Sequence, residues 1–323
     1  MSEINNVLFI GSKAYGLRCL EKLYSLKPES LAGIMTLDDS ADGRNVLESF
    51  EAFAEKNKIE IYIAQNRKES EAIISRIGPE LCIVNGWYWM IGNETLNAVP
   101  HGFLGMHNSL LPKYRGGSPL VWTMINGEKV AGLSVFSFTE GMDEGDIWAQ
   151  ERVPIERDDY IGDVLAKLED KAVGVLDRIY LKILSGDIKP SPQNHAEATY
   201  CAMRNPDDGL IDWNWPASRV YDFIRAQSTP YPGAFTYTDS GKVIIWRARP
   251  LDSTYYGTPG QVARISDEGA LVICGDSRPI LLEVAEYEGQ KLAASKIIKS
   301  IKTRFKNTAP IRNQFSSGGI YGI

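Results

Sequence analysis

The sequence predicts an α/β protein in which an open parallel sheet is followed by a small β-barrel. Three observations support this. Strand and helix patterns alternate over the first half of the chain, a long helix pattern and a proline-rich stretch follow, and the last third holds short apolar runs separated by Gly, Pro and Asp. A strand–helix–strand alternation is typical of a parallel sheet with right-handed crossovers. We place the boundary between two domains near residue 203.

The first half supplies these elements in succession. Short apolar runs end at glycine or polar residues, as buried strands do, and the segments between them place apolar residues three and four apart. The expected strands cover 7–10, 31–36, 59–63 and 81–84, and the expected helices cover 12–26, 46–56 and 69–77. Such sheets bind ligands beyond the carboxyl ends of their strands, so the loop after residue 84 and the segment before His107 are expected to build the site.

The second half begins with a helix pattern over 158–184, and the Gly- and Pro-containing stretch that follows, up to His195, is interpreted as a linker. Later apolar runs recur at the spacing of a small barrel. They cover 243–246, 261–265, 270–274 and 280–284. We expect a first domain over 1–203, a second over 204–300, and a tail over 301–323 that is basic and then rich in Gly and Ser. A basic stripe at helical spacing begins before this tail and continues into it, and it comprises Lys296, Lys299, Lys302, Arg304 and Lys306.

Composition narrows the class of protein. Hydrophobic residues make up 44% and charged residues 24%, the balance of a globular protein. With 35 basic and 41 acidic residues the formal charge is −6, which is unfavourable for holding a polyanion. The four cysteines form no CxxC pair and the three histidines no HExxH pair, so no metal site is expected. No signal-peptide pattern or membrane-length apolar run occurs, so a cytoplasmic protein without membrane contact is expected.

Two segments carry candidate chemistry. The first, GMHNSLLPKYRGG at 105–117, combines His107 with an irregular, glycine-rich backbone. The second, TEGMDEGDI at 139–147, places Asp143 in an acidic turn that lacks the spacing of a calcium loop. An aspartate near a histidine can fix its tautomer and favour its cationic form, which would make a general acid/base pair. A lone histidine is more often an incidental one at the end of a strand, but the residues that flank His107 favour the functional interpretation. A glycine-flanked acidic turn such as that around Asp143 is, taken alone, usually a solvated loop.

Together these motifs resemble those of the N10-formyltetrahydrofolate-dependent formyltransferases. The likeness covers nearly the whole chain, and its organisation is closest to sugar-nucleotide N-formyltransferases and methionyl-tRNA formyltransferase. It rests on HxSLLPxYRG, GxDxGDI, the helix WTMINGE at 122–128 between them, and IDW at 211–213, RA at 225–226 and YPGAFT at 231–236. The resemblance implies a Rossmann-like domain that holds the folate and an OB-like second domain.

The resemblance also implies roles for individual residues, with N10-formyltetrahydrofolate as co-substrate and no metal. The expected catalytic residues are His107, Asp143, which orients it, and Asn108. The expected folate-binding residues are Trp87, Trp89, Met90, Ile91, Thr139, Glu140, Gly141, Met142 and Asp143. The expected substrate-binding residues are Ser109, Leu110, Pro112, Tyr114, Arg115 and Gly116. For the aromatic cluster around Trp87, simple packing is the alternative interpretation.

One position departs from the family pattern. The asparagine expected two residues before the catalytic histidine is Gly105 here. Where such a donor stabilises an oxyanion, its loss costs on the order of 10²–10³ in rate. Asn108, Asn85 or a water against the Gly105 backbone could replace it. Gly105 is therefore compatible with an active enzyme, a slow one, or a binding protein that has lost turnover.

The acceptor amine is the remaining question. The barrel argues against glycinamide ribonucleotide, and the acidic segment LDDSADGR at 37–44 replaces the basic insertion of the tRNA enzymes. We therefore predict a small-molecule acceptor, a dTDP- or UDP-linked amino sugar such as a surface polysaccharide or lipopolysaccharide precursor, and do not expect nucleic acid as a partner. Methionyl-tRNA formyltransferase and a folate or sugar-nucleotide binder are the alternatives. The sequence also allows a homodimer.

Overall fold

The computed structural model describes residues 3–40 and 42–309, and the chain divides into two compact units. The first unit comprises Met1–Thr123 and Glu128–Met203, and the second comprises Met124–Gly127 and Arg204–Ile323. Within the described part of the chain, no helix is both long and apolar enough to cross a membrane.

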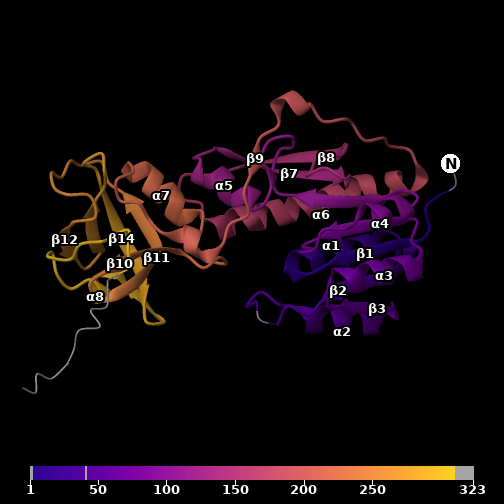
Figure 1. The fold of residues 1–323 in the computed structure, drawn as a ribbon, viewed down its shortest axis with the longest axis horizontal. Coiled ribbons are helices and arrows are strands. Elements are labelled where there is room, and N and C mark those ends of the chain that lie inside the picture. Colours follow the sequence, from indigo (N-terminus) through magenta and orange to yellow (C-terminus); the bar gives the residue numbers. More distant parts are fainter. Residues whose placement is uncertain (1–2, 41, 310–323) are drawn as a thin grey trace, which may run out of the picture. The chain divides into compact units, whose positions relative to one another are not determined.

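The first unit is built on a seven-stranded sheet of order β3-β2-β1-β4-β5-β7-β8 (Figure 1). The strands are β1 (Val7–Gly11), β2 (Leu31–Leu37), β3 (Ile61–Ala64), β4 (Leu81–Asn85), β5 (Phe103–His107), β7 (Val130–Ser137) and β8 (Ile147–Pro154). The first five pair in parallel, which confirms the predicted Rossmann-like sheet. The last two continue the sheet with antiparallel pairing and were not predicted.

The helices of this unit are α1 (Lys13–Leu26), α2 (Leu47–Asn57), α3 (Arg67–Ile77), α4 (Asn93–Ala98), α5 (Pro119–Ile125) and α6 (Ile161–Ser185). Glycines end two of them where the backbone turns left-handed, with φ +77 at Gly186 after α6 and φ +70 at Gly127 after α5. Glycine adopts this conformation without the steric cost of a side chain. For this reason α5 ends at Ile125, earlier than the predicted helix at 122–128.

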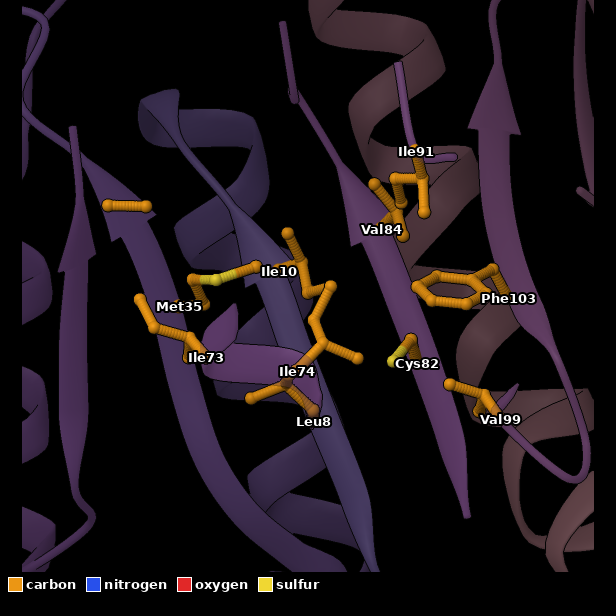
Figure 2. Packing of buried hydrophobic residues seen from close by; sticks show 11 residues of the cluster. Leu8, Ile10, Met35, Ile73, Ile74, Cys82, Val84, Ile91, Val99 and Phe103 are labelled. Carbon is orange, nitrogen blue, oxygen red and sulfur yellow. The ribbon is translucent and has the colours of Figure 1, made fainter. Parts of the chain in front are cut away.

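The core beneath α3 shows why these segments form strands. Side chains alternate across a strand, so Leu8 and Ile10 of β1 point to the same face of the sheet. There they join Cys82 of β4 and meet Ile73 and Ile74 of α3, all of them buried (Figure 2). Burying each large aliphatic side chain contributes about 1.5–3 kcal/mol to the free energy of folding, and this packing holds β1 and β4 in place against α3.

The second unit is an antiparallel six-stranded sheet of order β10-β11-β14-β13-β12, with β15 paired to β14. Its strands are β10 (Ala234–Thr238), β11 (Gly241–Pro250), β12 (Val262–Ser266), β13 (Gly269–Ile273), β14 (Pro279–Tyr287) and β15 (Gln290–Ala293). Helix α7 (Ala217–Arg225) packs against β11. A small β-barrel was predicted as the second domain, and four of its strands lie where the sequence placed them.

The segment after β15 corrects one expectation. Helix α8 (Ala294–Ile297) is a single turn, so the basic residues that follow it do not form a helical stripe. Instead, the segment at 304–306 bridges both edges of the sheet, with Lys306 paired to Tyr237 of β10 and Arg304 paired to Gln261 next to β12. Residues that we assigned to a tail therefore join the two edge strands and close the sheet into a barrel.

Phe305 anchors this closing segment, and its removal is expected to destabilise the protein. Its ring is 5% exposed and stacks on Trp213 with the ring centroids 5.2 Å apart. Phe305→Ala is expected to lower the free energy of unfolding by about 3–5 kcal/mol, measured by urea denaturation, because buried aromatic truncation leaves a cavity. Ile301→Ala is the matched control, since Ile301 is 59% exposed. Equal effects of the two substitutions would contradict the anchoring role.

Candidate active site

His107 lies at the carboxyl end of β5, in the centre of the sheet, and is 8% exposed. Its Nε2 atom lies 2.8 Å from the carbonyl oxygen of Tyr114. A carbonyl only accepts, so Nε2 donates this hydrogen bond and carries a hydrogen. Nδ1 faces Asp143 Oδ2 at 3.6 Å, beyond ordinary hydrogen-bond distance, and forms an ion pair with it when the ring is protonated.

Asp143 reaches His107 from the loop between β7 and β8. The backbone N–H of Gly116 donates to the same Oδ2 atom at 2.7 Å. Asp143 has φ +50, a left-handed conformation that costs a non-glycine residue of order 1–3 kcal/mol and occurs mostly at functional sites. The side-chain amide of Gln193 donates to the Asp143 carbonyl at 2.8 Å. The structure thus brings together His107 and Asp143, two of the three predicted catalytic residues, with the Asp143 carboxylate held by Gly116 and its backbone carbonyl held by Gln193.

Two of the predicted substrate-binding residues lie inside the protein. Ser109 is 1% exposed and its hydroxyl donates to the carbonyl of Lys113 at 2.7 Å. Arg115 is also 1% exposed, and its guanidinium donates to Gln193 Oε1 at 3.1 and 2.7 Å. Both side chains satisfy their polar atoms internally. Their placement supports the loop around His107 and gives no evidence of contact with a substrate.

The other four predicted substrate-binding residues are half-buried in the loop after β5. The Tyr114 hydroxyl donates to Glu128 at 2.9 Å, and Leu110 packs against Gly132 of β7. Pro112 follows a cis peptide bond, and Gly116 contacts Asp143 as described. These residues shape the surface next to His107.

The predicted folate-binding residues come from two loops that lie against each other. Asn93, at the start of α4, donates to the carboxylate of Glu140, which joins the loop after β4 to the loop after β7. Met90 and Met142, one from each loop, are 71% and 56% exposed. Each of the two loops therefore presents an apolar, solvent-accessible side chain.

The tryptophans of the first loop serve partly as packing. Trp87 and Trp89 contact each other edge to face with centroids 5.1 Å apart, and both pack on the core cluster beneath α3. Ile91 is 9% exposed and belongs to that cluster. Trp87 Nε1 is buried and makes no hydrogen bond within the described residues. Buried indole N–H groups in proteins usually donate a hydrogen bond, so Trp87 Nε1 is a candidate donor to a bound ligand.

Phe138 fills the place of the side chain that Gly105 lacks. A Cβ atom built on Gly105 would lie 2.0 Å from Cε1 of Phe138. The Phe138 ring stacks on Phe103 at 6.4 Å and contacts Phe136 at 5.3 Å, so neighbouring rings hold it there. Sequence reasoning missed Phe138 because nothing in its local pattern relates it to position 105. An aromatic wall thus stands beside His107 where the family pattern has an amide.

The two asparagines considered as replacements are placed differently. Asn85 donates to Met106 and Cys19, at 3.2 and 3.7 Å. Met106 points to the face of β5 opposite to His107, because side chains alternate along a strand, so Asn85 lies on the wrong side. Asn108 adjoins His107, and its Oδ1 atom is buried without a hydrogen-bond partner in the described residues. Only Asn108 is near enough to act beside the histidine.

Within the described residues, the site contains neither a reactive thiol nor a cluster of metal-ligating side chains. Cys201 lies near Asp143, and burial together with that carboxylate raises the pKa of its thiol to about 11. It is therefore protonated at neutral pH and a poor nucleophile. No group of three or more His, Cys, Asp or Glu side chains in residues 3–40 and 42–309 could hold a metal ion.

Comparison with known proteins agrees with the fold. Residues 7–179 match the formyl transferase family, and residues 204–302 match the formyl transferase C-terminal domain. The chain is 30% identical over 298 residues to the methionyl-tRNA formyltransferase of Acetivibrio thermocellus, covering 90% of this chain and 95% of that one. It is 33% identical over 316 residues to the bifunctional polymyxin resistance protein ArnA of Wigglesworthia glossinidia brevipalpis, covering 92% of this chain and 46% of that one.

Among solved structures, a similar one is the N-formyltransferase from Helicobacter canadensis in complex with folinic acid and dTDP-3-aminofucose. Its TM-score is 0.63 at 16% identity, and the match covers 90% of this chain and 100% of that chain. At this identity the likeness concerns the fold. The family matches span most of both units, and with them the chain is identified as a transferase enzyme that belongs to the formyl transferase family.

Proposed function

We propose that the protein transfers the formyl group of N10-formyltetrahydrofolate to the primary amine of a nucleotide-linked amino sugar. The observation that carries the choice of acceptor is an acidic loop beside the site, between β2 and α2. Asp42 of this loop forms an ion pair with Lys13 at 2.9 Å, and Asp39 pairs with the same ammonium group. The Tyr88 hydroxyl, from the loop after β4, lies 3.5 Å from Asp42.

The ion pairs hold the acidic loop against the rim of the site. Burial lowers the pKa of Lys13, but hydrogen bonds to Asp39, Tyr88 and Asp42 outweigh this and raise its pKa overall. The ammonium group of Lys13 therefore stays charged and remains paired with Asp39 and Asp42. A nucleic-acid backbone approaching this rim would meet three carboxylates, those of Asp38, Asp39 and Asp42, against two cations, Lys13 and Arg44, whereas a sugar nucleotide needs only one diphosphate contact.

The residues of the two site loops fit a folate. Trp87 offers a buried donor without a partner, and a pteridine ring carries acceptor nitrogen and oxygen atoms. Met90 and Met142 supply exposed apolar surface for its ring system. We assign the pteridine to these two loops, which Asn93 and Glu140 join, and the formyl group to the side of His107.

His107 and Asp143 then serve the transfer itself. The amine nitrogen bonds to the formyl carbon, the bond from that carbon to N10 breaks, and a proton moves from the amine to N10. In the protonated ring Nδ1 donates a hydrogen bond to the negatively charged formyl oxygen, because Nε2 already donates to the Tyr114 carbonyl, and Asp143 stabilises the charge of the ring. Asn108 Oδ1, buried and without a partner in the described residues, is placed to accept a hydrogen bond from the attacking amine.

Two other functions each have one observation in their favour. Relatives at 30% identity are methionyl-tRNA formyltransferases, which favours tRNA as acceptor. Phe138 in the place of the family's asparagine favours a binding protein without turnover. We prefer the sugar nucleotide because of the acidic loop.

A panel of acceptors tests this choice. The protein and N10-formyltetrahydrofolate are incubated with dTDP- and UDP-linked amino sugars and, separately, with charged initiator tRNA, and product is measured by mass spectrometry. We expect formylation of a sugar nucleotide, with a KM that changes less than about 10-fold between 50 and 200 mM salt because few charges are paired. Formylation of tRNA alone, with a loss of affinity on the order of 10³ or more over this range, would support the tRNA function instead. Folate binding without turnover across the panel would support the binder.

A further inference from the structure

Gln193 is a buried side chain whose two amide atoms face two different parts of the first unit. It lies in the proline-rich stretch after α6 and is 6% exposed. Its Oε1 atom accepts two hydrogen bonds from Arg115, at 3.1 and 2.7 Å. Its Nε2 atom donates to the carbonyl oxygens of Asp143 and Gly145, at 2.8 and 2.7 Å. The amide thus links a buried cation to the loop that carries the catalytic aspartate.

Arg115 fixes the orientation of this amide. Within the described residues its guanidinium is not paired with a carboxylate, and its remaining contacts are His195 at 3.3 Å and the Tyr200 hydroxyl at 3.4 Å. A buried cation requires acceptors, so the oxygen of Gln193 must point toward it. The nitrogen must then point toward the two loop carbonyls. The orientation of the amide therefore follows from the chemistry of both neighbours.

The loop needs such support. Asp143 has a left-handed backbone and is flanked by Gly141 and Gly145, which leaves the turn without intrinsic stiffness. The distance from Asp143 to His107 is already 3.6 Å, so a small relaxation of the loop would separate the pair. Gln193 is the side chain that grips this turn on both sides of Glu144.

We propose that Gln193 is a positioning residue for formyl transfer, which holds the Asp143 carboxylate against His107 by clamping the backbone of its loop. This inference rests on the proposed function of the site. It gives the proline-rich stretch after α6, which we interpreted as a linker, a part in the chemistry. It also gives Arg115 an indirect role, as the group that orients the clamp.

Gln193→Glu separates the two halves of the clamp. The carboxylate still accepts from Arg115, but it donates nothing to the carbonyls of Asp143 and Gly145 and repels both. We expect kcat to fall about 10-fold or more, because misplacement of a catalytic group by about 1 Å can cost 10²-fold, with a smaller change in KM. Asn194→Ala, a change at the exposed neighbour, is the control and is expected to leave kcat unchanged.

A double-mutant cycle distinguishes positioning from general destabilisation. In an Asp143→Asn background, where no carboxylate remains to be positioned, Gln193→Glu is expected to lower kcat by less than about 2-fold further. Multiplicative losses would overturn the proposal. If Gln193→Glu does not fold, the pair Arg115→Met and Gln193→Met removes the buried cation together with its acceptor, and the same cycle applies.

A second readout requires no substrate. Hydrogen exchange of the backbone amides at 139–146 is expected to speed up in Gln193→Glu but not in Asn194→Ala, while exchange in the core strands stays the same. Unchanged exchange in the loop would overturn the clamp even if activity fell. Failure to formylate any sugar nucleotide would refute the proposed acceptor and leave this measurement to decide the role of Gln193.

Discussion

Replacing His107 by alanine is expected to lower kcat for formyl transfer by about 10²–10⁴-fold, the usual contribution of a positioned acid/base group. The protonated ring can donate to the formyl oxygen through Nδ1, because Nε2 is held by the Tyr114 carbonyl and Nδ1 lies 3.6 Å from Asp143. Steady-state kinetics with the acceptor found in the panel measures the loss. Affinity for folate, measured by calorimetry, is expected to change little, because the proposed pteridine pocket lies in the neighbouring loops.

His101→Ala provides the control for this experiment. His101 precedes β5, is exposed, and lies at the opposite end of that strand from the site. Its removal is expected to leave kcat within about 2-fold of the parent value, as surface substitutions away from special features usually do little. Near-normal turnover of the His107→Ala variant would show that His107 is not the acid/base group of the reaction.

Restoring asparagine at position 105 is expected to fail unless Phe138 is made smaller at the same time. The Cβ of any residue at position 105 would meet Phe138 Cε1 at 2.0 Å, and the ring is held by Phe103 and Phe136. Overpacking of this kind typically costs about 1–3 kcal/mol, so Gly105→Asn alone should lower the free energy of unfolding by that amount or more. Thermal and urea unfolding measure the loss. Gly174→Ala is the control, because a Cβ there would meet its nearest neighbour only at 3.9 Å.

The double variant Gly105→Asn with Phe138→Ala tests the chemical consequence. We expect the two changes to be strongly coupled, with the asparagine costing little stability once the ring is gone. We also expect kcat to rise at least about 10-fold above that of Phe138→Ala alone, since an oxyanion donor is worth on the order of 10²–10³. A Gly105→Asn variant as stable as the parent would show that Phe138 does not occupy this place. A double variant no faster than Phe138→Ala would show that the site works without the amide.

The parallel half of the fold was predictable because each of its first strands has an apolar run in its own sequence. The runs around Phe9 and Ile83 are continuous and apolar, as strands covered on both faces must be. β8 was missed because most of its residues are half-buried or exposed, and its antiparallel pairing with β7 depends on a partner rather than on its own pattern. The closing segment around Phe305 was missed for the same reason: its basic composition predicts a solvated tail, and only its contacts show otherwise.

The site divides in the same way. His107 and Asp143 lie in recognisable segments, so their proximity could be expected from the motif and the sheet. The roles of Phe138 and Gln193 depend on which residues the fold brings next to them, Gly105 in one case and the loop of Asp143 in the other. Arg115 is the opposite case, because its position in the motif predicted contact with a ligand. The structure instead shows it buried, with its guanidinium donating to Gln193. Long-range neighbours of this kind leave no periodic trace in one sequence.

The segment at 304–306 also has a consequence for how the protein is made. It is translated after every strand of the second unit, yet it supplies pairing at Tyr237 of β10, next to the bridge between Leu210 and Phe235, and at Gln261 beside β12. Until it leaves the ribosome, Tyr237 and Gln261 carry unpaired backbone groups of the kind that join with other chains. Since domains generally fold from the amino terminus during synthesis, the first unit can be complete while the second still has open edges. Until the segment at 304–306 emerges, the second unit of the nascent chain thus remains open to pairing with other chains at these positions.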